Sequence, residues 1–307
     1  MLTPDLVGIA VAAANTVGVA FRILTLSTTF EATRKGARRI VSTRNRLALA
    51  KFRRRAKHID KFVALHAGAK SSWTALGVVP EADIVLLDSG MGVPVEPLLQ
   101  VRDKWRAETR KEWGVGEEPV VAYVHDGRAA SDQMDIAAVF KRIRVELPTD
   151  CRFATMGRHA PEGATALADA HARGRWLAGA DLIVSLASFV DQAVPVQEAA
   201  ALSVPAVVSR VKGHSEIVRH QHTGLVVPRG DLGAASEACL RLLREPKVRL
   251  EFGSRARSYA ARLHDRDFAV QKILRLYDQL LGGPQAEPAH LTAGGGIVGA
   301  SARDLVG

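Results

Sequence analysis

Short apolar runs alternate with helical stretches along most of this 307-residue chain, and this alternation is the feature that most limits its fold. Clear examples of the runs are Ile84–Leu87, Val120–Val124 and Leu182–Leu186. A strand that is apolar at nearly every position is buried on both faces, which is typical of parallel sheets covered by helices on both sides. The sequence therefore predicts an α/β protein whose ligands bind at the carboxyl ends of the strands.

The alternation falls into two series, which predict two domains. In the first series we expect strands at residues 23–26, 62–65 and 84–87 and a helix at 67–76. After a charged helix at 101–113, we expect strands at 120–124, 151–156, 182–186, 205–209 and 225–227, and helices at 135–144, 162–177, 196–202, 215–218, 232–243, 248–263 and 268–281. We place an N-terminal domain at 1–108, a C-terminal domain at 109–282 and a disordered tail, which lacks an apolar period, at 283–307. A doubly wound half usually has about five or six strands, so the first domain is either reduced or lacks its beginning.

The positive charge of the chain is concentrated in one segment. The net charge is +10, yet twelve Lys and Arg and one acid lie between Arg34 and Lys61, which leaves the remainder near neutral. Apolar residues recur at helical spacing between Ala37 and Ile59, so we expect a basic amphipathic helix there. Such a helix either docks on an anionic membrane surface or forms a solvated face. The segment lacks the pattern of a nucleic-acid-binding module, and we expect no nucleic-acid partner.

The two cysteines and the N-terminal residues further restrict the class of protein. Cys151 and Cys239 lie far apart and form no ligand pair, so we expect neither a zinc site nor a disulfide scaffold. Leu6–Phe21 is an uncharged run of 16 residues, shorter than the ~20 that span a bilayer, and we interpret it as core. We expect a cytoplasmic protein, or one held peripherally on the inner face of the membrane.

Four loops of the second series carry residues suited to a ligand, and the first of them directly follows a predicted strand. The first holds Gly127 and Arg128, where a glycine allows close backbone approach and a guanidinium can hold a phosphate by two hydrogen bonds. The second runs from Asp191 to Glu198, whose carboxylate can accept hydrogen bonds from a vicinal diol such as a ribose. The others are residues 209–216 and 223–228. Taken singly, each is also compatible with a plain structural loop.

The order and spacing of these loops are more specific. The stretch Ala180–Ser185, the stretch Gln197–Ser209 and the residues from Gly213 to Pro228 together resemble the retaining nucleotide-sugar glycosyltransferases of GT-B fold, the glycosyltransferase family 4-like or "glycosyl transferases group 1" enzymes. The resemblance implies two Rossmann-like domains that face each other across a cleft. It also implies transfer of a sugar from a nucleotide-sugar donor to a glycan, lipid or small-molecule acceptor, with retention, without a metal and without a further cofactor.

The same resemblance assigns roles to individual residues. Arg128, with Gly127, would hold the donor diphosphate, and Asp191 would be the catalytic acid. Glu198 would bind the nucleotide ribose, and its neighbour Ala199 lies in the same helix start. Gly213 and His214 would lie in the loop that faces the donor.

The sequence departs from the family pattern at three places. Gln133 stands where the family usually has a Lys, and Val190 stands where the first acid of its paired-glutamate motif is expected, with Asp191 one step away. Ser27 replaces the histidine of the N-terminal domain. These departures support an alternative, in which the chain keeps the scaffold without the chemistry and serves as a binding or partner subunit in glycan assembly.

Overall fold

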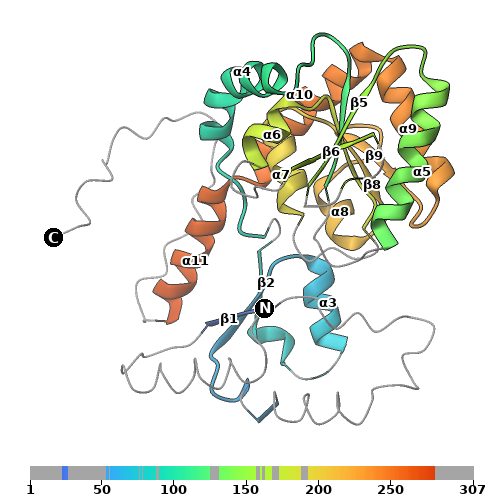
Figure 1. Cartoon of the computed structure of the whole chain (residues 1–307). Coiled ribbons are helices and arrows are strands. Elements are labelled where there is room, and N and C mark those ends of the chain that lie inside the picture. Colours follow the sequence, from blue (N-terminus) through green and yellow to red (C-terminus); the bar gives the residue numbers. More distant parts are fainter. Residues whose placement is uncertain are drawn as a thin grey trace.

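The structure is a computed structural model, described here at residues 23–26, 53–54, 56–75, 77, 79–87, 90–124, 131–156, 160, 163–167, 173–187 and 193–280. It contains two parallel sheets (Figure 1). One has three strands in the order β1-β2-β3, and the other has six in the order β6-β5-β4-β7-β8-β9. The prediction of an α/β protein built on parallel sheets is confirmed.

The three-stranded sheet consists of β1 (Ile23–Leu26), β2 (Lys61–Ala64) and β3 (Ile84–Leu86), with α3 (Ala67–Ala75) after β2 and a 3₁₀ turn, η1 (Glu81–Asp83), before β3. The side chains of β2 alternate between two cores. Phe62 packs with Trp73 of α3, whereas Val63 packs with Leu276 of the last helix, α11 (Arg266–Leu280). Burial on both faces explains why residues 62–65 form a continuous apolar run.

The six-stranded sheet lies between two layers of helices (Figure 1). Its strands are β4 (Val120–Tyr123), β5 (Arg152–Met156), β6 (Thr165–Leu167), β7 (Leu182–Ser185), β8 (Ala206–Ser209) and β9 (Gly224–Val227). One face is covered by α5 (Ser131–Glu146) and α9 (Leu232–Arg244). The other is covered by α4 (Val95–Glu112), α6 (Arg173–Gly179), α7 (Val194–Ala201) and α10 (Pro246–Leu263). The short α8 (Lys212–Ile217) follows β8.

One predicted element is wrong in part. We expected a single helix over residues 162–177, but residues 165–167 form β6, the edge strand that pairs with β5. The described helix α6 spans Arg173–Gly179. The pairing of Thr165 with Ala154 supplies backbone hydrogen bonds that the local sequence does not reveal. The charged helix also starts earlier than expected, at Val95 directly after Pro94.

Two backbone segments connect the sheets, and they lie side by side. The N–H of Val93 donates to the carbonyl of His264 at 2.8 Å, and the N–H of Arg266 donates to the carbonyl of Val93 at 3.0 Å. Gly92 has a φ of +66°, and a Cβ there would meet the backbone of Asp265 at 2.8 Å, so only glycine fits this crossing. The expected domain boundary at 108/109 falls inside α4, which packs against α6, α7 and α10.

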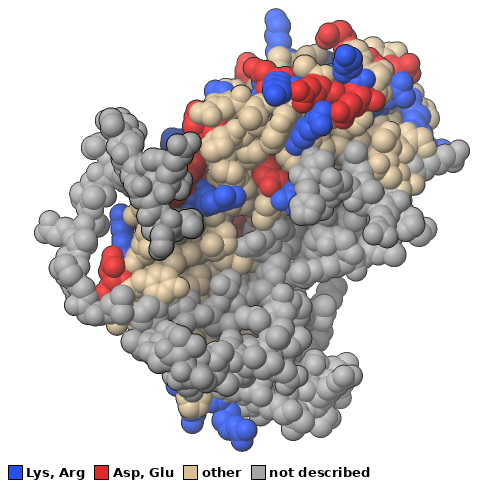
Figure 2. Space-filling model, turned by 60° about the vertical axis from the view of Figure 1, so that its left-hand side comes forward, with Lys and Arg blue, Asp and Glu red and all other residues tan. Residues whose placement is uncertain are grey.

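Several predictions fall outside the described residues. These are the core segment 6–21, most of the basic helix at 37–59 and the tail 283–307. On the face shown in Figure 2, acidic and basic side chains of the described residues intermix over the upper part of the molecule. Within the part of the chain that the structure describes, no helix is long and apolar enough to cross a membrane.

Candidate functional site

Three of the four loops that the sequence singles out begin at the carboxyl edge of the six-stranded sheet, after β4, β7 and β8. From β4 the chain moves outward to β5 and β6, then returns to β7 on the other side of β4 and continues to β8 and β9. The strand order therefore reverses between β4 and β7, and ligands of open parallel sheets bind at such a reversal. β4 and β7 lie side by side at this reversal, and β8 is next along the sheet.

Glu198 lies at this edge, on α7, and it is held by an arginine from the neighbouring helix. Arg173, the first residue of α6, donates from Nε to Oε2 of Glu198 at 2.5 Å and from Nη2 to Oε1 at 2.7 Å. The Arg173 side chain is 28% exposed and that of Glu198 15% exposed. Although burial opposes it, the hydrogen bond to Glu198 raises the pKa of the Arg173 guanidinium above its ordinary value. The two residues form a bidentate ion pair that still reaches solvent.

Close packing of α6 and α7 fixes the positions of Arg173 and Glu198. A Cβ on Gly174, the residue after Arg173, would lie 3.1 Å from the indole of Trp105, so glycine lets the start of α6 approach α4 closely. On α7, Pro195 stands in the first turn, where its missing N–H costs no helical hydrogen bond. The side chain of Ala199 is fully buried in the core, so this residue offers the site only its backbone.

Gly213 and His214 lie at the same edge, on α8. Both are buried, and His214 is only 1% exposed. Its Nδ1 lies 3.1 Å from the carbonyl oxygen of Ser209, which can only accept, so Nδ1 carries the proton. The Ser209 hydroxyl in turn donates to the carbonyl of Ala187 at 2.5 Å. Through Nδ1, His214 thus ties α8 to the end of β8, and Ser209 ties that strand end to the loop after β7.

The structure brings together some of the predicted site residues and leaves others undescribed. Glu198, Ala199, Gly213 and His214 occupy the carboxyl edge of one sheet. The remaining predicted residues, Gly127, Arg128 and Asp191, lie outside the described residues, as does Ser27. Gln133 lies on α5, but its side chain is also outside the described part. Their predicted roles therefore stay predictions.

Sequence reasoning missed two residues at this edge. Arg173 was hidden inside the predicted helix 162–177, whereas the structure places it at the beginning of the described helix α6, at the carboxyl edge of the sheet. A signal was available, because Arg173 and Arg175 flank a glycine directly before an apolar stretch. Glu216, on α8, accepts hydrogen bonds from the N–H groups of Ala67 at 3.2 Å and Gly68 at 3.3 Å. Its carboxylate thereby sits at the N-terminus of α3, where a negative charge is favoured, and joins the two sheets.

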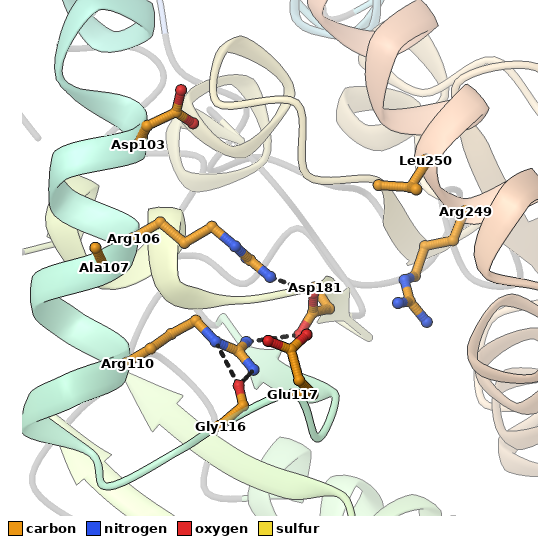
Figure 3. A pocket seen from close by; sticks show the side chains of 9 residues that line it. All are labelled: Asp103, Arg106, Ala107, Arg110, Gly116, Glu117, Asp181, Arg249 and Leu250. Carbon is orange, nitrogen blue, oxygen red and sulfur yellow. Dashed lines mark hydrogen bonds and ion pairs between the residues drawn. The ribbon is translucent and has the colours of Figure 1, made fainter.

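A pocket of about 480 Å³ opens at the opposite, amino edge of the same sheet (Figure 3). Arg106 and Arg110 of α4 point to Asp181, the residue before β7, with distances of 2.7 and 2.9 Å. The N–H of Val120 donates to the same carboxylate at 2.8 Å. Burial raises the pKa of Asp181, but the two guanidinium charges and the backbone hydrogen bond outweigh it and lower the pKa below its ordinary value. These charges neutralise one another, so we assign the pocket a structural role.

Metal ligands do not cluster in the described part of the chain. Among those residues, no group of three or more His, Cys, Asp or Glu is arranged to hold a metal ion.

The part of the sequence that forms the carboxyl edge matches a known protein family. Residues 127–245 match the model of the family described as Glycosyl transferases group 1, which confirms the resemblance seen in the motifs. A curated relative is N-acetyl-alpha-D-glucosaminyl L-malate synthase of Bacillus anthracis, 25% identical over 189 residues that cover 56% of this chain and 48% of the relative. The chain thus spans about half the length of that relative.

Solved structures share the fold at low sequence identity. HepE of Anabaena, solved in complex with UDP and glucose, superposes with a TM-score of 0.71 at 13% identity, covering 90% of this chain and 76% of that one. Sucrose-phosphate synthase of Thermosynechococcus elongatus superposes with a TM-score of 0.69 at 17% identity, covering 91% and 78%. The chain therefore has the GT-B fold, as the motifs predicted.

Proposed function

We propose that this chain transfers a sugar from a nucleotide-sugar donor to an acceptor. Residues 127–245 match the family model of the group 1 glycosyl transferases. One observation carries the proposal: the family match coincides with the carboxyl edge of the six-stranded sheet, where Glu198 and the α8 loop lie. HepE, whose structure shares this fold, was solved in complex with UDP-glucose, and UDP-glucose is a donor of the proposed class.

The donor would lie along this edge, each of its parts against a different loop. Glu198 accepts hydrogen bonds from the ribose hydroxyls, and the loop at Gly213 and His214 faces the diphosphate. Arg128, with Gly127, neutralises the diphosphate as it leaves, and the N-termini of helices add further positive potential. Asp191 is the acid that faces the transferred sugar in this proposal.

The stereochemistry and the metal requirement are finer parts of the same proposal. Positive side chains and helix N-termini replace a divalent metal as the stabiliser of the leaving group, and the product keeps the anomeric configuration of the donor. Two measurements check these parts. Turnover should persist in excess chelator, and proton NMR of the first product formed should show the donor's anomer. Loss of turnover with the chelator, or an inverted anomer, would contradict them.

The central experiment measures binding and turnover with a panel of nucleoside diphosphates and their sugars. We expect one nucleotide to bind at micromolar concentration, and we expect Arg128→Ala and Glu198→Ala to abolish that binding. Loss of one phosphate cation should lower turnover by about 10²–10³-fold. If no nucleotide in the panel binds the unmodified chain, the proposed function fails.

The acceptor side is proposed from the charge of the chain. The basic segment between Arg34 and Lys61 lies in the N-terminal part of the sequence, and its charge suits docking on anionic lipid or on an anionic acceptor. Sedimentation with vesicles should require anionic lipid and weaken with salt. Equal binding to neutral vesicles would leave the segment as a solvated face.

A second function has a specific observation in its favour. Gln133 and Val190 stand where the family pattern has a cation and an acid, so the chain would bind a nucleotide without transferring the sugar. In that case the chain acts as a partner subunit in glycan assembly. Tight nucleotide binding with no transfer to any acceptor, and no hydrolysis of the donor, would favour this function.

A further inference from the structure

The ion pair between α6 and α7 occupies the side of the Glu198 carboxylate that a ligand with two neighbouring donors would need. Arg173 approaches the carboxylate end-on, with Nε 2.5 Å from Oε2 and Nη2 2.7 Å from Oε1. A fork of this kind takes the inner lone pair of each oxygen, and the outer lone pairs point away to opposite sides. The two acceptor positions that lie close together are therefore filled by the arginine.

A vicinal diol needs the same two positions. Its hydroxyls sit on adjacent carbons, so both can donate to one carboxylate only where the two acceptor positions lie side by side. The outer lone pairs are too far apart for the two hydroxyls of one diol. The guanidinium of Arg173 and the hydroxyl pair of a ribose therefore exclude each other at Glu198.

The closed ion pair is the stable state of Glu198 when no ligand is bound. The Glu198 side chain is 15% exposed, and a carboxylate with so little access to water is costly without a partner. Among the described residues, Arg173 is the hydrogen-bonding partner that the structure gives this side chain. Arg173 thus supplies two hydrogen bonds that a bound diol would supply instead.

Opening the pair requires a side-chain movement only. α6 packs against α7, so the backbones of both residues stay where they are. The Arg173 side chain is 28% exposed, and its long stem allows the guanidinium to turn into water. The separated guanidinium regains hydration, whereas the vacated carboxylate needs two new donors. A vicinal diol brings both.

We propose that the Arg173–Glu198 ion pair is an autoinhibitory contact, which closes the ribose position of the empty chain and which the diol of the donor must displace. This inference rests on the proposed function, since it assumes that a nucleotide places its ribose at Glu198. Arg173 competes with the ribose and does not bind it.

The contact lowers the affinity for the nucleotide and eases its departure. The apparent affinity is the intrinsic affinity multiplied by the fraction of chains in which the pair is open. After sugar transfer the nucleoside diphosphate must leave. As its ribose withdraws, Arg173 returns to the carboxylate, so no unpaired charge is left behind.

The test compares ligands with and without the diol. UDP, GDP and ADP, each with its 2′,3′-dideoxy counterpart, are titrated by calorimetry into the full chain and into Arg173→Gln, Arg173→Lys, Glu198→Gln and the double variant Arg173→Gln/Glu198→Gln. The readout is the ratio of the two affinities, in which a change of charge near the phosphates cancels. Arg175→Gln is the matched control, since Arg175 lies on the same helix but pairs with Glu108 and Glu112 of α4. A thermal melt of each variant establishes that it is folded.

We expect the ratio of ribonucleotide to dideoxynucleotide affinity to be about five- to thirtyfold higher in Arg173→Gln than in the unmodified chain, because only the ribonucleotide has to open the pair. Arg173→Lys should give a smaller rise, since an ammonium keeps the charge but lacks the fork. Glu198→Gln should lose the preference for the diol, and adding Arg173→Gln to it should leave the ratio unchanged. Arg175→Gln should have the ratio of the unmodified chain.

A second measurement follows the contact in the unmodified chain. The Nε–H group of Arg173 gives its own NMR signal, which is assigned by its absence from the spectrum of Arg173→Lys. We expect the ribonucleotide to move this signal to the position of a guanidinium in water. The dideoxy ligand should leave the signal in place.

Other outcomes overturn the inference. A lower ratio in Arg173→Gln means that Arg173 assists the diol, and an unchanged ratio means that the ribose binds without opening the pair. A rise that persists in the Glu198→Gln background means that Arg173 does not act through Glu198. If Arg173→Gln does not fold, Arg173→Lys and the NMR signal decide among these outcomes. If the unmodified chain binds none of the six ligands, the proposed function has failed, and this result is distinct from binding with an unchanged ratio.

Discussion

The two edges of the six-stranded sheet each hold a carboxylate bound by arginine, but they use it differently. At the amino edge, Asp181 receives two guanidinium groups and a backbone N–H, and its side chain is 12% exposed. At the carboxyl edge, Glu198 receives one guanidinium from the described residues and is 15% exposed. Burial is nearly equal, so the difference lies in how many of the lone pairs are occupied. A saturated carboxylate holds the fold together, whereas a partly occupied one can still bind a ligand.

Removing the saturated carboxylate should have the largest effect. Asp181→Ala leaves Arg106 and Arg110 facing each other without their counter-charge, and we expect the free energy of unfolding to fall by about 3–5 kcal/mol. Urea denaturation followed by circular dichroism measures this. The control is Asp103→Ala in the same pocket, whose carboxylate is 89% exposed and should matter by no more than ~0.5 kcal/mol. Equal losses in both variants would remove the contrast between the edges.

Removing the charge of the partly occupied carboxylate should change binding more than stability. Glu198→Gln is expected to weaken nucleotide binding by about 1.5–3 kcal/mol, the worth of a hydrogen bond to a charged group, and to change unfolding by about 1 kcal/mol. Calorimetric titration and a denaturation curve on the same sample measure both. Glu112→Gln, at the exposed partner of Arg175, is the control. If Glu198→Gln binds nucleotide normally but has a much lower free energy of unfolding, Glu198 stabilises the fold and does not bind the nucleotide.

The two carboxylates should also differ in how they respond to acid. The pKa of Asp181 is lowered in the folded chain, so the folded state holds fewer protons than the unfolded state near the ordinary aspartate pKa of about 3.9. The stability from Asp181 is therefore fully present above that value and is lost as the pH falls through it toward the lowered pKa. Unfolding free energies measured between about pH 5 and pH 3 should fall less steeply in Asp181→Asn. Parallel curves for the two proteins would contradict this.

The smallest expected effect concerns a third carboxylate, Glu216, which joins the two sheets. Glu216→Gln removes the negative charge at the N-terminus of α3, and we expect a loss of about 0.5–1 kcal/mol in unfolding free energy. The neighbouring exposed Ser215→Ala is the control, and differential scanning calorimetry resolves changes of this size. A loss as large as that in Asp181→Ala would mean that Glu216 holds the fold together as strongly as Asp181 does.

The sequence predicted elements best where a strand is buried on both faces. β4 and β7 lie in the middle of the sheet, and their continuous apolar runs reveal them directly. β6 lies at the edge, and two of its residues, Thr165 and Ala166, are exposed, so no apolar run marks it. The helical interpretation of residues 162–177 failed for this reason.

The candidate site was predictable as a location but not as a set of contacts. Glu198 followed from its place after a strand and from its motif, yet its ion-pair partner, Arg173, is 25 residues earlier in the chain. The pairing of these two residues depends on the packing of α6 against α7, which the sequence does not show. Similarly, His214, which we expected in the loop that faces the donor, is buried against Ser209, a contact that depends on tertiary packing.

The return of α11 to the first sheet has a consequence for the order in which the chain can fold during synthesis. The second face of β2 and β3, with Val63, Leu65 and Leu87, is covered by Leu276 of α11. On a ribosome, these strands leave the exit tunnel long before α11 has been translated. The six-stranded sheet, whose covering helices all come from residues 95–263, can complete its core first. The sheet that is translated first is thus the one whose second face is covered last, so an apolar face stays exposed while the rest of the chain is synthesised.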